Sequence, residues 1–158
     1  MDIYSIVNIK EFFAEYGIEV SETTIKIDNS FCIESKSLAD HLRGSVKCVV
    51  FTITLGSEVD FEIRKKQVES MAAAYELDKQ ANIYIEKLAT KMQEAISIEA
   101  RKNGFTETHR FSPGFGDLKL DYQKLFLKLS KAKHITVTDS NLLIPQKTIT
   151  AVIGLKKV

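Results

Sequence analysis

Residues 46–55 have the sequence VKCVVFTITL, which is rich in β-branched side chains and contains neither Gly nor Pro. Such a run is typical of a strand at the centre of a sheet. Gly56 ends it, and no further Gly or Pro occurs until Gly104. The stretch between these glycines is rich in Ala, Glu, Lys, Ile, Leu and Met, a composition that favours helix over about 45 residues. The sequence therefore predicts a central strand followed by a long helical segment.

The helical segment is expected to contain two helices, because about 45 residues in one helix would form a rod of about 68 Å on a small domain. We expect the break near residues 72–76. In the first helix, Ile63, Val68 and Met71 are predicted to face inward. In the second helix an apolar stripe recurs at helical spacing, and it consists of Tyr84, Leu88, Met92, Ala95 and Ile96.

The segments on either side of this unit carry a mixture of helix and strand signals. Helices are predicted over residues 8–16, from a cap at Ser37 to Gly44, and over residues 121–129. Strands are predicted over residues 23–28, 134–140 and 147–155, with Pro145 at the turn between the last two. This mixed order predicts an α+β fold, in a single domain over residues 1–158, rather than a regular alternation of strand and helix.

Composition and charge exclude several classes of protein. The net charge of +1 gives no reason to expect a nucleic-acid or membrane partner. The N-terminus has an acid at position 2 and no cationic region, which argues against a secretory signal. Cys32 and Cys48 show no metal or redox spacing, so we expect two buried thiols in a reduced, cytoplasmic protein. The 3 histidines lie far apart in sequence, and no metal site is predicted.

The segment HRFSPGFGDLKL, residues 109–120, has the composition of a sharp bend, and we call it the Pro-Gly corner. Its Pro and two Gly residues impose an irregular backbone whose amide and carbonyl groups need partners. Arg110 presents a planar fork suited to a carboxylate, and a neighbouring Phe ring offers a stacking surface. These features suit a small molecule with an aromatic ring and a carboxylate. The alternative is a structural turn, with Arg110 paired to Asp117 or to a helix acid.

Two longer runs carry a resemblance to a known family. TETHRFSPGFGDLKLDYQKLF, followed by ITVTDSNLLIPQKTITAVIGL, resembles the activation domain of vitamin B12-dependent methionine synthase, in its short stand-alone form. The motif is Arg-x-x-Pro-Gly-aromatic, followed by a Ser-x-x-x-x-Pro segment from Ser140 to Pro145. TLGSEVDFEI also fits the stand-alone form, and the similarity extends from about Gly44 to Leu155. The resemblance implies a curved antiparallel sheet packed against long helices.

The resemblance also implies a site for S-adenosylmethionine. By analogy with the family, Arg110 contacts the methionyl carboxylate, and the backbone around Ser112 and Gly114 holds the adenine. Phe115 stands where the family has Tyr, and Glu86 matches a contributing glutamate on the preceding helix. No side chain of this set is expected to act as acid, base or nucleophile.

The function implied is an accessory one, in support of a cobalamin-dependent methyltransferase, rather than catalysis by this chain alone. Such a stand-alone activation protein binds S-adenosylmethionine and supports reductive methylation of cobalamin carried by a partner. The expected partner is a truncated methionine synthase or another corrinoid protein, with a flavodoxin- or ferredoxin-like electron donor. Phe115 and the C-terminus at Val158 leave an alternative, a scaffold that binds the corrinoid protein without S-adenosylmethionine.

Overall fold

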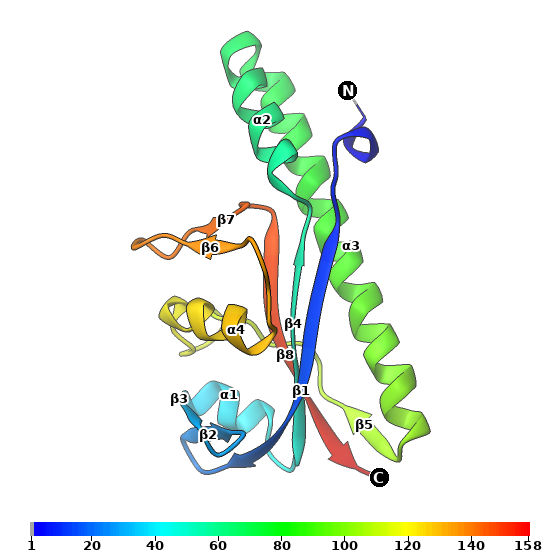
Figure 1. Cartoon of the computed structure of the whole chain (residues 1–158), viewed down its shortest axis with the longest axis vertical. Helices are drawn as coiled ribbons and strands as arrows, with labels where there is room; N and C mark the ends of the chain where they lie inside the picture. Colours follow the sequence, from blue (N-terminus) through cyan, green and yellow to red (C-terminus); the bar gives the residue numbers. More distant parts are fainter. Residues whose placement is uncertain (1) are drawn as a thin grey trace.

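A six-stranded antiparallel sheet organises the computed structural model, which describes residues 2–158 (Figure 1). Its strands follow the order β3-β2-β1-β4-β8-β5. They are β1 (Lys10–Val20), β2 (Thr24–Ile27), β3 (Phe31–Glu34), β4 (Lys47–Thr54), β5 (Phe105–Glu107) and β8 (Thr148–Lys157). A separate ribbon contains β6 (Thr136–Val137) and β7 (Leu143–Ile144). The helices are α1 (Lys36–His41), α2 (Ser57–Glu69), α3 (Met71–Lys102) and α4 (Gln123–Leu129), with short 3-10 turns η1 (Ile3–Ser5) and η2 (Leu120–Tyr122).

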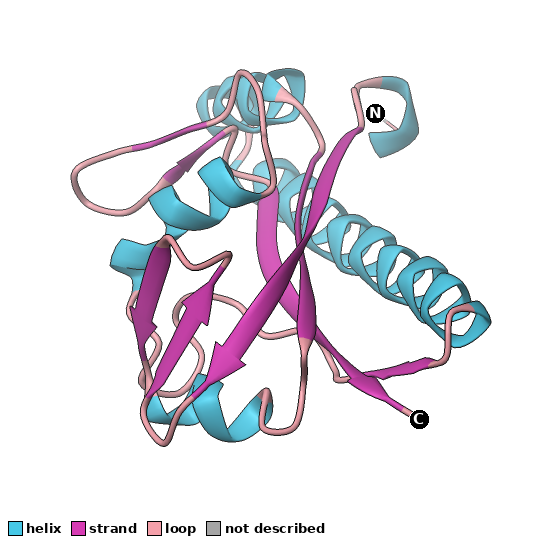
Figure 2. Cartoon of the chain, turned by 60° about the horizontal axis from the view of Figure 1, so that its bottom comes forward, coloured by secondary structure: helices cyan, strands magenta, loops and turns pink. Residues whose placement is uncertain are grey.

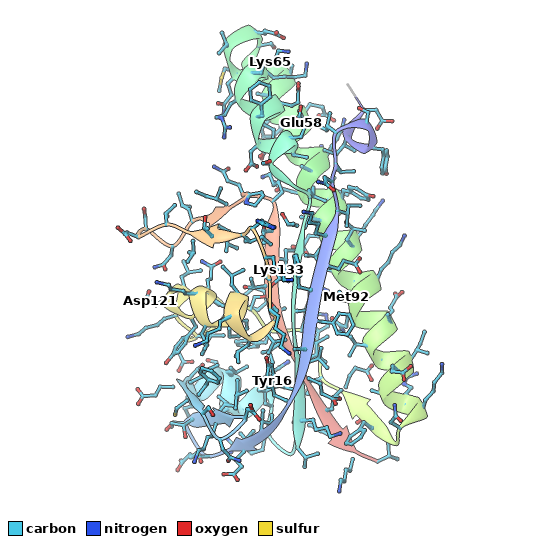
Figure 3. The ribbon with its side chains drawn as sticks, viewed as in Figure 1. Tyr16, Glu58, Lys65, Met92, Asp121 and Lys133 are labelled. Atoms are coloured by element: carbon cyan, nitrogen blue, oxygen red, sulfur yellow. The ribbon has the colours of Figure 1, made fainter. Side chains whose placement is uncertain are left out.

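Strand β4 is central and buried on both faces, as its sequence predicts. Val49, Phe51 and Ile53 belong to the core between the sheet and α3. Met92 of α3 is part of the same core (Figure 3). Cys48 and Val50 belong to a second core, shared with α1 and α4. Figure 2 shows α3 on one side of the sheet and α1 and α4 on the other. The predicted α+β fold, with a sheet packed against a long helix, is therefore confirmed.

The predicted helix over residues 8–16 is wrong, because most of this segment lies in strand β1. Its half-buried residues Phe12, Ala14 and Tyr16 alternate with exposed ones, which is the period of a strand. β1 pairs with β4 from Lys10↔Thr54 to Gly17↔Lys47, and with β2 beyond that point. Pairing with β4 provides hydrogen bonds along the segment, and an isolated short helix is only marginally stable.

The helical segment does contain two helices, but the break is at Ser70 rather than at residues 72–76. The two helices form a hairpin that extends beyond the sheet (Figure 1), with Lys65 near its tip (Figure 3). Val68 and Met71 are therefore 89% and 68% exposed, contrary to the prediction that they face inward. Ala95 is also exposed, whereas the other four residues of the predicted stripe pack in or against the core.

Three smaller expectations need correction. Ser35, not Ser37, caps α1, because its side chain accepts a hydrogen bond from the Leu38 N–H. Cys32 is exposed; only Cys48 is buried, and burial raises the pKa of the Cys48 thiol to about 12. The strand predicted over residues 134–140 is reduced to the two residues of β6. Among residues 2–158, no helix is long and apolar enough to cross a membrane.

Candidate functional site

Arg110 lies in the segment that follows β5 and continues along the edge of β8. Thr108 N–H donates to the Gly154 carbonyl at 2.8 Å, and Phe111 exchanges two backbone hydrogen bonds with Val152. In such an extended segment successive side chains point to opposite faces. Phe111 accordingly packs against the core shared with α1 and α4, while Arg110 lies against α3. The backbone thus directs the guanidinium to the α3 side of the sheet.

Three side chains of α3 hold the Arg110 guanidinium. Its Nη2 lies 2.8 Å from Glu86 Oε2, and its Nη1 lies 3.4 Å from both Thr90 Oγ1 and Gln93 Oε1. Gln93 Oε1 also accepts from the Arg110 backbone N–H at 3.3 Å. The spacing i, i+4, i+7 puts these three residues on one flank of the helix. The Arg110 side chain is only 13% exposed, whereas that of Glu86 is 63% exposed.

A groove of about 480 Å³ opens beside this cluster, between α3 and the segment from β5 to Arg110. We call it the polar groove, because most of its lining carries hydrogen-bonding or charged groups. The lining from α3 includes Thr90, Gln93, Glu94, Ser97, Ile98 and Arg101. Glu107, His109 and Arg110 form the opposite wall. Both signs of charge face the groove, so it suits a zwitterionic ligand better than a simple anion or cation.

The Pro-Gly corner uses part of its own backbone to close the bend. Gly114 N–H donates to the Leu118 carbonyl at 2.7 Å, and Phe115 N–H donates to the Ser112 carbonyl at 3.0 Å. Gly114 adopts a φ of 97°, which a residue with a side chain rarely adopts. Within residues 2–158, the Ser112 N–H has no hydrogen-bond partner. Ser112 therefore retains a backbone donor, whereas Gly114 does not.

Aromatic rings form a small cluster at the corner. The Phe115 ring is half exposed and lies edge-on to Phe111, with 5.6 Å between the ring centroids. His41 of α1 packs against the other side of the cluster, 5.0 Å from the Phe111 centroid. One aromatic surface is thus supported from behind and remains accessible to a flat ligand.

Asp117, in the second half of the corner, binds the start of α1 rather than Arg110. Its carboxylate accepts hydrogen bonds from the Ser35 hydroxyl and from the backbone N–H groups of Lys36 and Ser37. The Ser35 hydrogen bond and then the Ser37 N–H hold the pKa of this carboxyl below its usual range. Of the two internal partners expected for Arg110, the helix acid is therefore the one observed, and it is Glu86.

The structure brings Glu86 of α3 into direct contact with Arg110, 24 residues further along the chain. Arg110 and Glu86 form the ion pair, and Ser112, Gly114 and Phe115 lie on the adjoining corner. Thr90 and Gln93 were not predicted from the sequence. Their spacing from Glu86 was a usable signal, because polar residues at i, i+4 and i+7 form a polar flank on an otherwise amphipathic helix. The ligand roles of the five residues stay predictions.

Comparisons with known proteins identify the fold. No family model and no curated protein matches the chain. Among solved structures it is similar to a crystal structure of the MetH reactivation domain bound to AdoHcy, with a TM-score of 0.71 and 12% sequence identity. The alignment covers 96% of this chain and 59% of that chain, so this protein spans little more than half the length of its structural neighbour. The chain has an activation-domain-like fold, as the resemblance implied.

Proposed function

We propose that this chain binds S-adenosylmethionine at Arg110, with its amino-acid end beside the polar groove and its base at the Pro-Gly corner, and supports reductive methylation of cobalamin on a methionine synthase or related corrinoid methyltransferase. The strongest support is that the fold is shared with a domain whose crystal structure is bound to AdoHcy. In addition, Arg110 of the motif lines the polar groove. The role in this proposal is that of an accessory subunit. Its partner carries the cobalamin, and a flavodoxin- or ferredoxin-like protein donates the electron.

The amino-acid end of the ligand fits the cluster around Arg110. A guanidinium binds a carboxylate through two parallel hydrogen bonds, and Nη2 now serves the Glu86 carboxylate instead. Because the Glu86 side chain is 63% exposed, it is free to yield this place to the ligand. Glu86 then turns to the ligand's ammonium group. Thr90 and Gln93 keep the guanidinium oriented throughout, since both contact its other nitrogen, Nη1.

The nucleoside end fits the corner with one correction to the sequence prediction. The Ser112 N–H and the accessible face of Phe115 are the groups offered to adenine, because the Gly114 N–H already serves Leu118. Gly114 contributes by lacking a side chain: a Cβ there would lie 3.1 Å from Leu120 Cδ2 at an unfavourable φ. The absence of a hydroxyl on Phe115 removes one hydrogen bond, worth about 0.5–1.5 kcal/mol, relative to the family's Tyr.

Cobalamin on the partner would supply the chemistry, as the acceptor of the sulfonium methyl group, with S-adenosylhomocysteine as the product that remains. This chain contributes position, because a methyl donor held close to the acceptor converts a bimolecular encounter into a local one. Arg110 and Glu86 anchor the ligand's amino-acid end, and the corner anchors its base. The methyl group between these two anchors remains accessible to a docked partner.

Isothermal titration with S-adenosylmethionine tests the proposal. We expect Arg110→Ala to weaken binding by about tenfold or more, equivalent to about 1.4 kcal/mol. Arg64→Ala is the matched control, because Arg64 is an exposed arginine on α2, far along the chain from the corner. Absence of heat with the unmodified protein, or equal affinities for all three proteins, contradicts S-adenosylmethionine binding at Arg110.

The Glu86–Arg110 ion pair favours one second candidate, a scaffold that binds the corrinoid protein without S-adenosylmethionine. In that case Arg110 is a structural residue that ties the corner to α3. A corrinoid methyltransferase that co-elutes with this chain, in the absence of any heat on titration with S-adenosylmethionine, supports the scaffold. Co-elution together with saturable heat supports the activation protein.

A further inference from the structure

A second groove lies on the opposite flank of α3, against strand β1. It has a volume of about 830 Å³, and we call it the β1–α3 groove. Gln93 and Ala95 mark the two flanks: they are two residues apart, which corresponds to about 200° around a helix. Gln93 contacts Arg110, whereas Ala95 lines the β1–α3 groove. The two grooves are therefore separated by the body of the helix.

The β1–α3 groove exists because α3 leaves part of the sheet uncovered. Phe13 of β1 is directly opposite Phe51 of β4, so both side chains lie on the face that α3 packs against. Phe51 is completely buried, yet Phe13 is 64% exposed. A helix is about 10 Å wide and strands are about 4.8 Å apart, so one helix covers about two strands. In this sheet α3 covers β4 and β8.

The floor of the groove is apolar and reaches the core. Met92, Val49 and Leu155 line it and are each less than a tenth exposed. Phe13 and Phe105 stand at its sides, and Ala95 contributes only a methyl group from the helix. The volume is within the range of about 300–1,000 Å³ that is usual for small-molecule sites.

The rim of the groove is acidic. Three of its lining residues, Glu11, Glu15 and Glu99, carry carboxylates, and only Lys47 carries an ammonium, a formal balance of −2. Lys47 Nζ is 3.8 Å from Glu15 Oε2 and also lies over the Phe105 ring, so it is already engaged. Glu99 has an exposed partner, Lys102, at 3.9 Å, and an exposed pair at that distance contributes little. The potential at the rim therefore favours a cation.

We propose that the β1–α3 groove is a binding site for a small apolar molecule that carries one positive charge. The apolar part rests on Met92, Val49 and Leu155, beside the Phe13 ring. The cationic group lies at the rim, near Glu11 and Glu99. This site is independent of the polar groove and does not require S-adenosylmethionine.

Three probes of equal length test the proposal: 4-phenylbutylamine, 4-phenylbutanol and 4-phenylbutyrate. Each is titrated into the ¹⁵N-labelled full chain, and amide shifts report both the affinity and the location. We expect the amine to bind about tenfold or more tightly than the carboxylate, with the alcohol between them. The largest shifts are expected at Phe13, Ala95 and Leu155. Equal affinity for the three probes, or shifts centred on Arg110, overturns the proposal.

Variants separate the charge effect from the apolar effect. The double variant Glu11→Gln/Glu99→Gln is expected to remove the preference for the amine and to leave the affinity for the alcohol unchanged. Phe13→Ala is expected to weaken all three probes by about fivefold or more. Both changes are at exposed positions, so the variants should fold. Arg110→Ala should leave amine binding unchanged, and a loss in that variant contradicts a separate site.

Discussion

Arg110 and Asp117 both belong to the Pro-Gly corner, and their side chains bind different parts of the molecule. Arg110 is bound to Glu86 of α3, and Asp117 is bound to the start of α1. The sequence alone predicted that Arg110 would find a carboxylate, but it left the choice between Asp117 and a helix acid open. That choice depends on the backbone pairing of Phe111 with β8, which directs the Arg110 side chain to α3. Such long-range pairing leaves no local signal in the sequence.

The hydrogen bonds to the Asp117 carboxylate should make the stability of the chain depend on pH. The pKa of Asp117 in the folded chain is below the ordinary value of 3.8. The charged form is therefore favoured by folding, so its contribution is present above about pH 4 and is lost as the pH falls through the lowered pKa. We expect Asp117→Asn to be less stable than the unmodified protein at pH 6, and the difference to shrink as the pH is lowered toward 3. Urea unfolding over this pH range measures it.

The control for Asp117 is Asp139→Asn, at an exposed carboxylate in the loop between β6 and β7. We expect the Asp139 variant to follow the unmodified protein at every pH. A constant difference between Asp117→Asn and the unmodified protein, down to pH 3, would show that the carboxylate charge has no part in docking the corner on α1.

At the scale of elements, the longest apolar or helical runs were the most predictable. Strand β4 and the helical character of residues 57–102 follow from composition and periodicity. Strand β1 did not follow, because Phe12 and Tyr16 are compatible with both the helical and the strand period. Its identity depends on β4 as a neighbour, which supplies hydrogen bonds along eight residue pairs. The break between α2 and α3 was predicted a few residues too late, because several residues near Ser70 are equally good helix formers and give no local signal for it.

Ser70 is expected to stabilise α3 as its N-terminal cap. Its hydroxyl accepts a hydrogen bond from the Ala73 N–H at 3.2 Å and so caps α3 where the two helices of the hairpin meet. We expect Ser70→Ala to lower the free energy of unfolding by about 0.5–2 kcal/mol. Ser70→Asp retains an acceptor and should remain close to the unmodified protein. Equal stability of Ser70→Ala and the unmodified protein would show that the turn needs no cap.

At the scale of the whole molecule, one sheet separates two apolar cores. Phe51 is buried in the core under α3, and Phe126 of α4 is buried in the core on the other side. In the second core, Tyr16 ties β1 to α4, because its hydroxyl donates to the Leu129 carbonyl at the end of α4. The cores share strands β4 and β8, so we expect them to unfold together.

Loss of a buried ring from either core is expected to destabilise the whole molecule. Phe51→Ala and Phe126→Ala should each lower the free energy of unfolding by about 3–5 kcal/mol, since each ring is completely buried. Far-UV circular dichroism and tyrosine fluorescence should report a single shared transition in both variants. Val68→Ala, at a position 89% exposed on the hairpin tip, should change stability by less than about 0.5 kcal/mol. Separate transitions in either Phe variant would indicate two independent units.

A crystal structure of this chain grown with S-adenosylmethionine is the sharpest test of the proposed binding site. We predict the ligand's carboxylate on Arg110 Nη2 beside the polar groove, Glu86 turned away from the guanidinium, and the base beside Ser112 and Phe115. A crystal grown at saturating ligand that retains the 2.8 Å Glu86–Arg110 contact, with no ligand at Arg110 or at the Pro-Gly corner, would contradict this binding mode.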